Sequence, residues 1–204
     1  MRARYNPGVH NSKEAWMLKP IGAVNCLYPM PTVLVGAQVD GKPNFLTVAW
    51  VGIVAHNAIS IASNKDHFTN VGIRQHQTFS VNIPSEAQVK ETDYCGLVSG
   101  SRTDKSNLFE CFYGSLKTAP MIATCPLCME CRVRQTLDID DHELFVGEIV
   151  QAYASESVLT AGTVDFAKVK PTLFELPTGH YWKLGEPLAK AWEVGRQLLG
   201  KSQI

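Results

Sequence analysis

Apolar and polar residues alternate along much of the chain after residue 30, which is the pattern of strands that bury one face. Asp40-Gly41 is a strong hairpin-turn signal between two such stretches, and residues 138–142 form a second polar turn. The pattern predicts strands at residues 31–39, 44–55, 58–63, 78–84, 128–137 and 143–154.

Helix signals lie between and after these strands. DHFTNVGIRQHQ at 66–77 is long enough for a short helix, which Asp66 or Thr69 would cap. Ser85 begins a second predicted helix that runs to Gly96, with Gln88 at capping-box spacing. NLFECF predicts another short helix at 107–112. The clearest helical pattern is EPLAKAWEVGRQLLG, whose expected buried face carries Leu188, Ala191, Trp192, Gly195, Leu198 and Leu199.

Strands joined mainly by hairpins predict a mainly β fold with peripheral helices, most simply an antiparallel β-barrel. The strands do not alternate with long helices, so a doubly wound parallel sheet is disfavoured. No Walker loop follows a strand, and no G-x-G-x-x-G does either, so a Rossmann nucleotide site is not supported. The first residues are polar and irregular, so we expect an N-terminal arm at 1–20 and one domain at 21–204.

Charge and hydropathy exclude several classes of partner. Nineteen Lys and Arg residues balance nineteen Asp and Glu residues, so there is no basic excess for nucleic acid. The most apolar stretch, 45–63, contains His and Asn and is a poor membrane span. The N-terminus lacks the apolar core of a signal peptide. We therefore expect a cytoplasmic protein with no membrane partner, whose six cysteines are reduced thiols.

Three of those cysteines form a C-x2-C-x2-C run, at Cys125, Cys128 and Cys131. Bacterial ferredoxins begin with this spacing, but their fourth cysteine would fall at Gln135. In a strand, Cys128 and Cys131 point to opposite faces, which separates potential ligands. An iron–sulfur or zinc module remains the alternative reading, but we expect no metal ligands here.

A polar segment at 63–70 has the composition of an anion site. It precedes a predicted helix, whose first N–H groups and positive dipole end favour a phosphate. Lys65 and His67 would add charge, and Thr69 and Asn70 would donate hydrogen bonds. The same composition also fits a polar strand-to-helix turn with an ordinary cap.

The loop at 99–105 is a second candidate, because small residues let backbone N–H groups approach an anion. Lys105 or Arg102 would then close over that anion. The competing interpretation is a solvated loop in which Asp104 caps the next element. A third segment, 44–50, places a hydroxyl and a large aromatic ring in an otherwise small or apolar strand.

Taken in order, these segments resemble the flavin reductase-like family, which has an FMN-binding split barrel, and within it the flavoredoxins. The resemblance extends from about residue 20 to residue 200. It is carried by seven segments: YPMPTVLVGA, NFLTVAW, SNKDHFTN, FSVNIP, CGLVSGSRTDK, MECRVR and HYWKLGEPL.

The resemblance implies a split β-barrel, non-covalent FMN and a homodimer. It also implies a set of cofactor contacts, which are Thr47, Val48, Ala49, Trp50, Ser63, Lys65, His67, Thr69, Asn70, Asn82, Ser99 and Lys105. Many relatives have phenylalanine where this chain has Ser106, so the cavity wall formed there differs. Relatives often have one cysteine at the position of Cys131, which leaves Cys125 and Cys128 without a family role.

Two redox functions follow from this resemblance. One is an enzyme, an NAD(P)H-dependent flavin reductase, and the other is a flavoredoxin-type electron carrier fed by a redox protein. No compact nicotinamide motif separates them. We find no persuasive catalytic triad, and hydride transfer to a flavin requires none, since the cofactor carries the chemistry. His180 and Tyr181 either line the approach to the ring or serve as ordinary packing residues.

Overall fold

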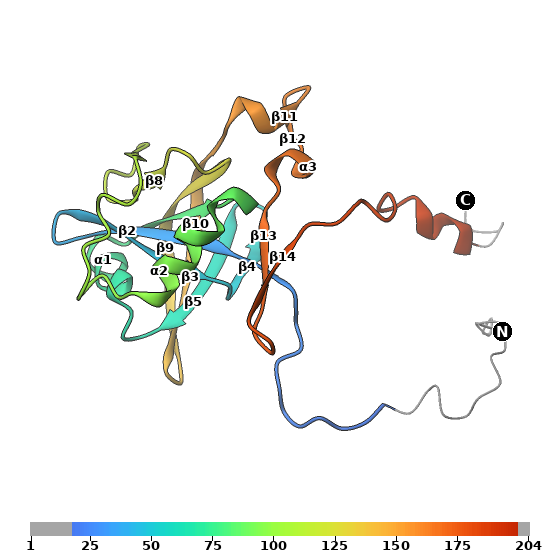
Figure 1. Cartoon of the computed structure of the whole chain (residues 1–204), viewed down its shortest axis with the longest axis horizontal. Helices are drawn as coiled ribbons and strands as arrows, with labels where there is room; N and C mark the ends of the chain where they lie inside the picture. The colour runs from blue at the N-terminus through green and yellow to red at the C-terminus, as the bar shows by residue number, and fades with distance from the viewer. Residues whose placement is uncertain (1–17, 200–204) are drawn as a thin grey trace.

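The computed structural model describes residues 18–199, and its main feature is a seven-stranded sheet (Figure 1). Neighbouring strands are antiparallel and follow the order β3-β2-β6-β9-β10-β5-β4. The strands are β2 (Val33–Val39), β3 (Lys42–Val48), β4 (Val51–Ala55), β5 (Ala58–Asn64), β6 (Thr78–Ile83), β9 (Leu127–Ile139) and β10 (His142–Ala154). The predicted strands and both hairpins are confirmed, except that the stretch expected at 44–55 is divided in two.

That division explains how the sheet closes. The edge strands β3 and β4 are consecutive in the chain, and only Ala49 and Trp50 separate them. With two residues between them, Val48 and Val51 can be at most about 11 Å apart, so the sheet must curl until its edges approach. We call this junction of β3 and β4 at Ala49 and Trp50 the barrel seam. The carbonyl of Trp50 accepts a hydrogen bond from the Ala62 N–H at 2.8 Å, which ties the seam to β5. The result is a split antiparallel barrel, as predicted.

Side chains on the two faces of the sheet build two separate apolar clusters. One contains Val35, Ile61, Phe79, Val81, Cys131 and Phe145 among its buried members. The other contains Leu34, Phe45, Cys95, Met121, Ile122, Cys125 and Cys128. A Cβ on Gly147 would lie 2.5 Å from the Phe79 ring, so the close packing of that ring requires glycine. Because successive side chains of a strand point to opposite faces, β2 and β9 each contribute residues to both clusters.

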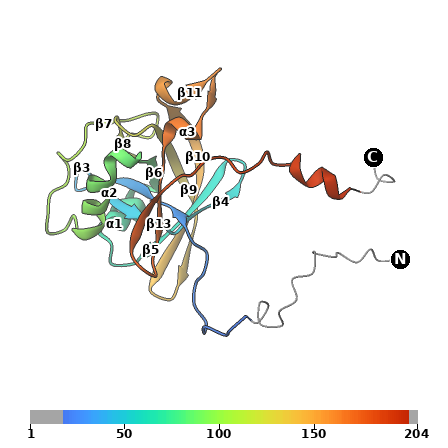
Figure 2. The ribbon, with the colours of Figure 1, turned by 45° about the vertical axis from the view of Figure 1, so that its right-hand side comes forward.

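Two short helices flank the barrel (Figure 2). Helix α1 (Phe68–His76) packs on β2, and a Cβ at Gly72 would lie 2.2 Å from the Gln38 carbonyl oxygen. The 3-10 turn η1 (Glu86–Gln88) leads into α2 (Val89–Leu97), which packs on β3. The predicted capping box between Ser85 and Gln88 is present. Helix α1 has no side-chain cap at its N-cap residue His67, so the prediction that Asp66 or Thr69 caps it is wrong.

A second, three-stranded sheet lies beside the barrel seam and has the order β1-β13-β14. It consists of β1 (Met30–Pro31), β13 (Thr172–Glu175) and β14 (His180–Lys183). The remaining elements are short: β7 (Cys111–Phe112), β8 (Met121–Ile122), η2 (Glu156–Val158), β11 (Leu159–Thr160), β12 (Thr163–Val164), α3 (Phe166–Val169) and η3 (Val194–Leu198).

Two helix predictions are wrong. NLFECF is not helical: Leu108 and Phe109 lie in an irregular turn and Phe112 in β7, and all three pack against the second apolar cluster. The helix predicted for 186–200 is reduced to η3 over its described residues. Its apolar side chains contact no core, since Leu188 is 100% exposed and Trp192 90% exposed. A segment of this length does not hold a helix in water without such packing.

The expected N-terminal arm falls largely outside the described residues, which begin at Leu18; residues 18–20 have no regular secondary structure. Among residues 18–199, no helix combines the length and the apolar character needed to cross a bilayer.

Candidate functional site

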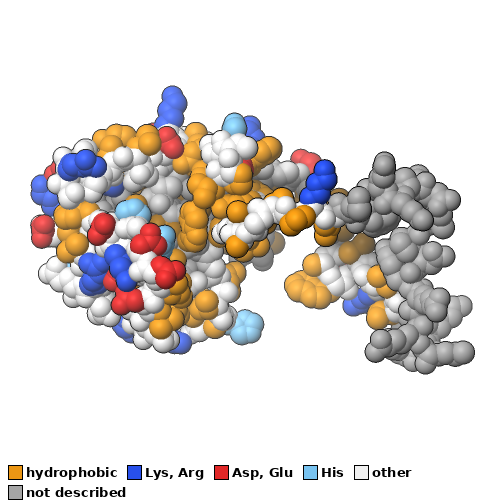
Figure 3. All heavy atoms as spheres, turned by 90° about the horizontal axis from the view of Figure 1, so that it is seen from below, with side chains coloured by type: hydrophobic (Ala, Val, Ile, Leu, Met, Phe, Trp, Pro, Cys, Tyr) orange, Lys and Arg blue, Asp and Glu red, His pale blue; other side chains and the backbone are white. Residues whose placement is uncertain are grey.

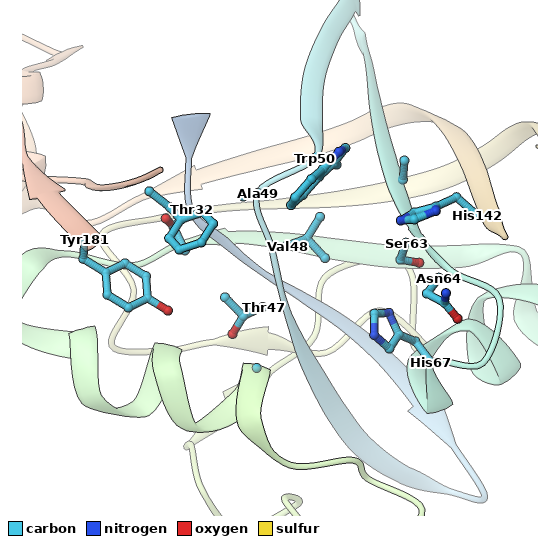
Figure 4. A pocket seen from close by; sticks show the side chains of 13 residues that line it. Thr32, Thr47, Val48, Ala49, Trp50, Ser63, Asn64, His67, His142 and Tyr181 are labelled. Carbon is cyan, nitrogen blue, oxygen red and sulfur yellow. The ribbon is translucent and has the colours of Figure 1, made fainter. Parts of the chain in front are cut away.

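A cavity of about 210 Å³ opens where the barrel is split (Figure 4). One wall is the end of β3 together with the two seam residues, and the opposite wall is the end of β5 and the turn after it. The small sheet closes a third side through Phe174 and Tyr181. Its lining residues are Thr32, Thr47, Val48, Ala49, Trp50, Ala62, Ser63, Asn64, His67, Gly96, His142, Phe174 and Tyr181.

The four residues predicted on this strand, Thr47, Val48, Ala49 and Trp50, all line this cavity. Val48 and Ala49 are buried beside it, and Trp50 stands at its edge, 38% exposed. The Thr47 hydroxyl donates to the Thr92 carbonyl, which holds helix α2 against β3 at the base of the cavity. The wall is therefore mainly apolar, which suits a flat aromatic ligand.

Two buried polar atoms at this cavity have no hydrogen-bond partner among the described residues. They are Nδ1 of His67 and Oγ1 of Thr32, and the Thr32 side chain is almost fully enclosed. A buried polar atom without a partner is costly, so each of these atoms fits a ligand that completes its hydrogen bond. Burial, followed by the nearby charges of His142 and Lys105, lowers the pKa of His67 below its ordinary value.

A second cavity of about 220 Å³ adjoins the first, and both are lined by His67 and Gly96. Its wall includes Thr69 on α1 and the loop from Ser99 to Arg102. Helix α1 begins here with His67 as an N-cap that makes no side-chain hydrogen bond, and its first turn has no acidic residue. The uncapped helix end is thus free to attract an anion.

Close contacts fix the shape of this second cavity. The Thr69 hydroxyl accepts a hydrogen bond from the Asn44 amide at 2.7 Å, which leaves its own proton available to a ligand. A Cβ on Gly100 would lie 2.1 Å from Oδ1 of Asn44, so only glycine lets the loop approach this closely. The Ser99 and Ser101 hydroxyls hydrogen-bond each other at 2.9 Å on the same loop.

Lys105 is placed differently from the lysine expected to close over an anion. Its ammonium donates to the carbonyls of Phe45 at 2.5 Å, Val98 at 3.1 Å and Cys95 at 3.4 Å. The side chain is buried, and burial lowers its pKa. Lys105 therefore holds the loop against the barrel, while its charge remains at the wall of the second cavity.

A network of hydrogen bonds and one ion pair beneath α1 fixes the conformation of the turn that carries His67. Ser63 donates to Asn70 at 2.7 Å, and Asn70 donates to Glu143 at 3.0 Å. Arg74 closes the network through a 2.6 Å ion pair with Glu143 and a hydrogen bond to the Lys65 carbonyl. Asn70 thus positions the site from behind and lines neither cavity.

Two other expected contacts also lie away from the cavities. The Lys65 ammonium donates to the carbonyl of Asp140, in the β9–β10 turn, at 2.9 Å and lies 3.3 Å from the carboxylate of Asp138, near the end of β9. The Asn82 amide group donates to the Leu34 carbonyl and accepts from the Ile122 N–H, both at 2.9 Å. Asn82 therefore joins strand β2 to β8, and Lys65 braces the turn that precedes α1.

Several residues that line the first cavity could not be predicted from the sequence, because they come from segments far apart in the chain. Thr32, His142 and Phe174 carry no local signal that would distinguish them from ordinary strand residues. His142 lies at the right of Figure 4, and its Nδ1–H donates a 2.7 Å hydrogen bond to the Asp141 carboxylate. Of the two C-terminal candidates, Tyr181 lines the cavity, whereas His180 is exposed outside it.

Tyr181 also connects the small sheet to helix α2. Its hydroxyl donates to Asp93 at 3.1 Å, and Figure 4 shows the ring on the side of the cavity opposite His142. Burial, together with the hydrogen bond to Asp93, raises the pKa of Tyr181 to about 12. The phenol therefore stays protonated, as a donor, throughout the physiological pH range.

The cysteine run lies within the core. Cys125, Cys128 and Cys131 are 5%, 2% and 0% exposed, so all three are buried. Cys128 and Cys131 belong to different apolar clusters, as strand alternation predicts. Burial raises the pKa of Cys131 to about 12, so its thiol stays protonated. The alternative of a metal module is not supported.

Comparison with known proteins identifies the family of the chain. Residues 25–173 match the flavin reductase like domain. A flavoredoxin from Methanosarcina acetivorans is 44% identical, with a TM-score of 0.87 over 90% of this chain and all of its own. A flavoredoxin from Desulfovibrio vulgaris (Miyazaki F) is 33% identical, with a TM-score of 0.82 over 88% of this chain and all of its own.

More distant structures share the fold alone. An FMN-binding protein from Thermus thermophilus is 20% identical, with a TM-score of 0.72 over 93% of this chain and all of its own. The class defined by fold and site is a split-barrel, flavin-binding redox protein. The chain belongs to the flavin reductase-like family, and within that family it is most similar to the flavoredoxins.

Proposed function

We propose that the protein binds FMN without a covalent bond and transfers electrons through it. The observation that carries this proposal is the pair of adjoining cavities, one mainly apolar and one beside an uncapped helix end, which share His67 and Gly96. FMN has the matching parts, a flat ring and a phosphate. When bound, the flavin supplies the electron chemistry, and the protein supplies position and electrostatics.

The proposed contacts follow the two cavities. Val48, Ala49 and Trp50 would pack along the ring, and the Thr32 hydroxyl and His67 imidazole would complete hydrogen bonds to its polar atoms. The Thr69 hydroxyl and the backbone N–H groups at the start of α1 would bind the phosphate, and the Ser99–Arg102 loop would enclose it. Lys65, Asn70 and Asn82 would act indirectly by holding this frame, and Ser63, which lines the first cavity, would both face the flavin and support Asn70.

The electron donor is either NAD(P)H or a redox protein, and we favour an enzyme that oxidises NAD(P)H. The donor would reach the flavin at the open side of the first cavity, between the end of β5 and the small sheet. His142, held by Asp141, and Tyr181 flank that opening. We also propose a homodimer and a cytoplasmic location; all six cysteines are free thiols, the state expected in a reducing compartment.

Cofactor release tests the flavin proposal. Purified protein, reconstituted with an equimolar mixture of FMN and FAD, is freed of unbound flavin and then precipitated with acid. We expect the supernatant to contain FMN, near one equivalent per chain. Recovery of FAD alone, or of no flavin, would contradict the proposal.

Anaerobic reduction separates the two functions. FMN-loaded protein is mixed with NADH or NADPH, and bleaching of the visible flavin band is followed. Rapid bleaching by either nucleotide identifies a reductase. Slow bleaching by both, with fast reduction by a low-potential redox protein, identifies an electron carrier.

A further inference from the structure

The C-terminal segment after β14 has the sequence of an amphipathic helix but lacks a surface on which to fold. Figures 1 and 2 show it leaving the barrel and extending away from it. Leu188, Trp192 and Leu198 are 100%, 90% and 82% exposed. Large apolar side chains gathered on one short segment are a sign of a missing partner.

The backbone of this segment is also strained at the position where the helix fails. Trp192 has a φ of 61°, a left-handed conformation that bulky residues rarely adopt. On its two sides, Lys190 and Glu193 already form an ion pair at helical i, i+3 spacing, and η3 begins at Val194. A continuous helix through Trp192 would relieve the strain if its apolar face were covered.

The barrel carries an uncovered apolar surface of its own at the seam. Among residues 18–199, strand β4 is a sheet edge that pairs with β5 alone, and its Ile53 and Val54 are 87% and 53% exposed. It begins directly after Trp50, at the mouth of the first cavity. Apolar side chains gather on the side of the barrel that faces the extended segments (Figure 3). Exposed apolar edge strands are normally covered in native proteins.

We propose that two copies of the chain exchange these segments, so that residues 187–199 of one chain fold as a helix against β4 of the other. The proposal rests on the homodimer of the proposed function and assigns it a contact. Two-fold symmetry places each segment on the partner's edge, and both exposed surfaces are covered at once. The partner's helix then lies beside Trp50, at the mouth of the flavin cavity.

The size and charge of the surfaces suit a second copy as the partner. The three segment residues and the seam residues Trp50, Ile53 and Val54 provide six large apolar side chains per copy. At roughly 100 Å² each, two copies would bury about 1,200 Å², the lower end of stable interfaces. The chain has a formal net charge of zero, so two copies do not repel each other at long range.

Single substitutions on each surface test the contact. FMN-saturated wild type, Trp192→Glu and Ile53→Asp are compared by sedimentation velocity, and Phe166→Glu serves as the matched control. Phe166 is 56% exposed on α3, outside both surfaces. We expect a wild-type dimer, a dissociation constant raised roughly 100-fold in each test variant, and no change in the control.

Mixing the two test variants identifies exchange between chains. The Ile53→Asp chain keeps an intact segment and the Trp192→Glu chain keeps an intact edge, so one of the two contacts can form. We expect a heterodimer tighter than either variant alone. A monomeric wild type, a dimer insensitive to both changes, or no heterodimer on mixing would overturn the proposal. Flavin absorbance in the same runs reports cofactor binding separately, so failure of exchange is distinguishable from failure of the flavin function.

Discussion

His67 lies where the ring cavity and the phosphate cavity meet, and its unpaired Nδ1 makes it the most informative single residue of the site. Burial is the main cause of its lowered pKa, and the neighbouring charges of His142 and Lys105 add to it, against an opposing effect of Asp66. The folded, flavin-free protein therefore keeps this imidazole neutral under conditions in which an exposed histidine takes up a proton.

That lowered pKa predicts a pH-dependent stability. Between the folded pKa and the unfolded value of about 6.5, the unfolded chain binds more protons than the native chain. The free energy of unfolding of the flavin-free protein should therefore fall as pH is lowered through this range. His67→Asn should reduce the slope in urea titrations between about pH 5 and 7, whereas His56→Asn, in the exposed β4–β5 turn, is the control. An unchanged slope for His67→Asn would contradict this account.

Thr69 allows a sharper test of phosphate binding. Thr69→Ala removes one hydroxyl donor to a charged group, worth about 1.5–3 kcal/mol, so FMN should bind roughly ten- to a hundred-fold more weakly. Riboflavin, which lacks the phosphate, should be barely affected. Thr69→Ser keeps the hydroxyl and is the control, which fluorescence titration compares with the alanine variant. Equal losses for FMN and riboflavin would show that Thr69, through Asn44, only shapes the fold.

At the scale of elements, strand β9 separates the cysteines that a short motif places together. Because Cys128 and Cys131 face different clusters, three coordinated thiolates would require the strand to unfold. We therefore expect the triple variant Cys125→Ser, Cys128→Ser and Cys131→Ser to keep its flavin. Three buried hydroxyls should lower its stability by a few kcal/mol. Metal analysis is the direct measurement: one equivalent of iron or zinc, lost in the variant, would contradict the expectation.

The elements also show which patterns are informative in the sequence. Strands and hairpins were predictable because alternation, the Asp40-Gly41 turn and the polar turn at 138–142 are local features. The division of residues 44–55 at Ala49 and Trp50 was not, since barrel closure and not residue preference breaks that strand. The segment at 186–200 has a true helical period, but period alone does not provide a surface on which to pack. Lys65 and Lys105 have the charge expected of a phosphate site, yet tertiary contacts direct both ammonium groups to carbonyls.

At the scale of the whole molecule, the site is a consequence of barrel closure. Among the described strands, β3 pairs with β2 and β4 pairs with β5, so the two edges meet without pairing to each other, and the cavity opens at that point. The small sheet and helix α2 close that cavity, and they are joined by the Tyr181–Asp93 hydrogen bond. Occupation of this cavity should therefore stabilise the whole fold.

Flavin binding should then raise the unfolding temperature by an amount that the binding constant sets. At a free FMN concentration one hundred times the dissociation constant, linkage gives about 2.7 kcal/mol of stabilisation. For a chain of 204 residues this corresponds to a shift of roughly 5–10 °C, which calorimetry would resolve. At the same concentration riboflavin should produce a smaller shift, because it leaves the α1 end and the Ser99–Arg102 loop without an anion. An FMN shift no larger than the riboflavin shift would mean that the second cavity does not bind the phosphate.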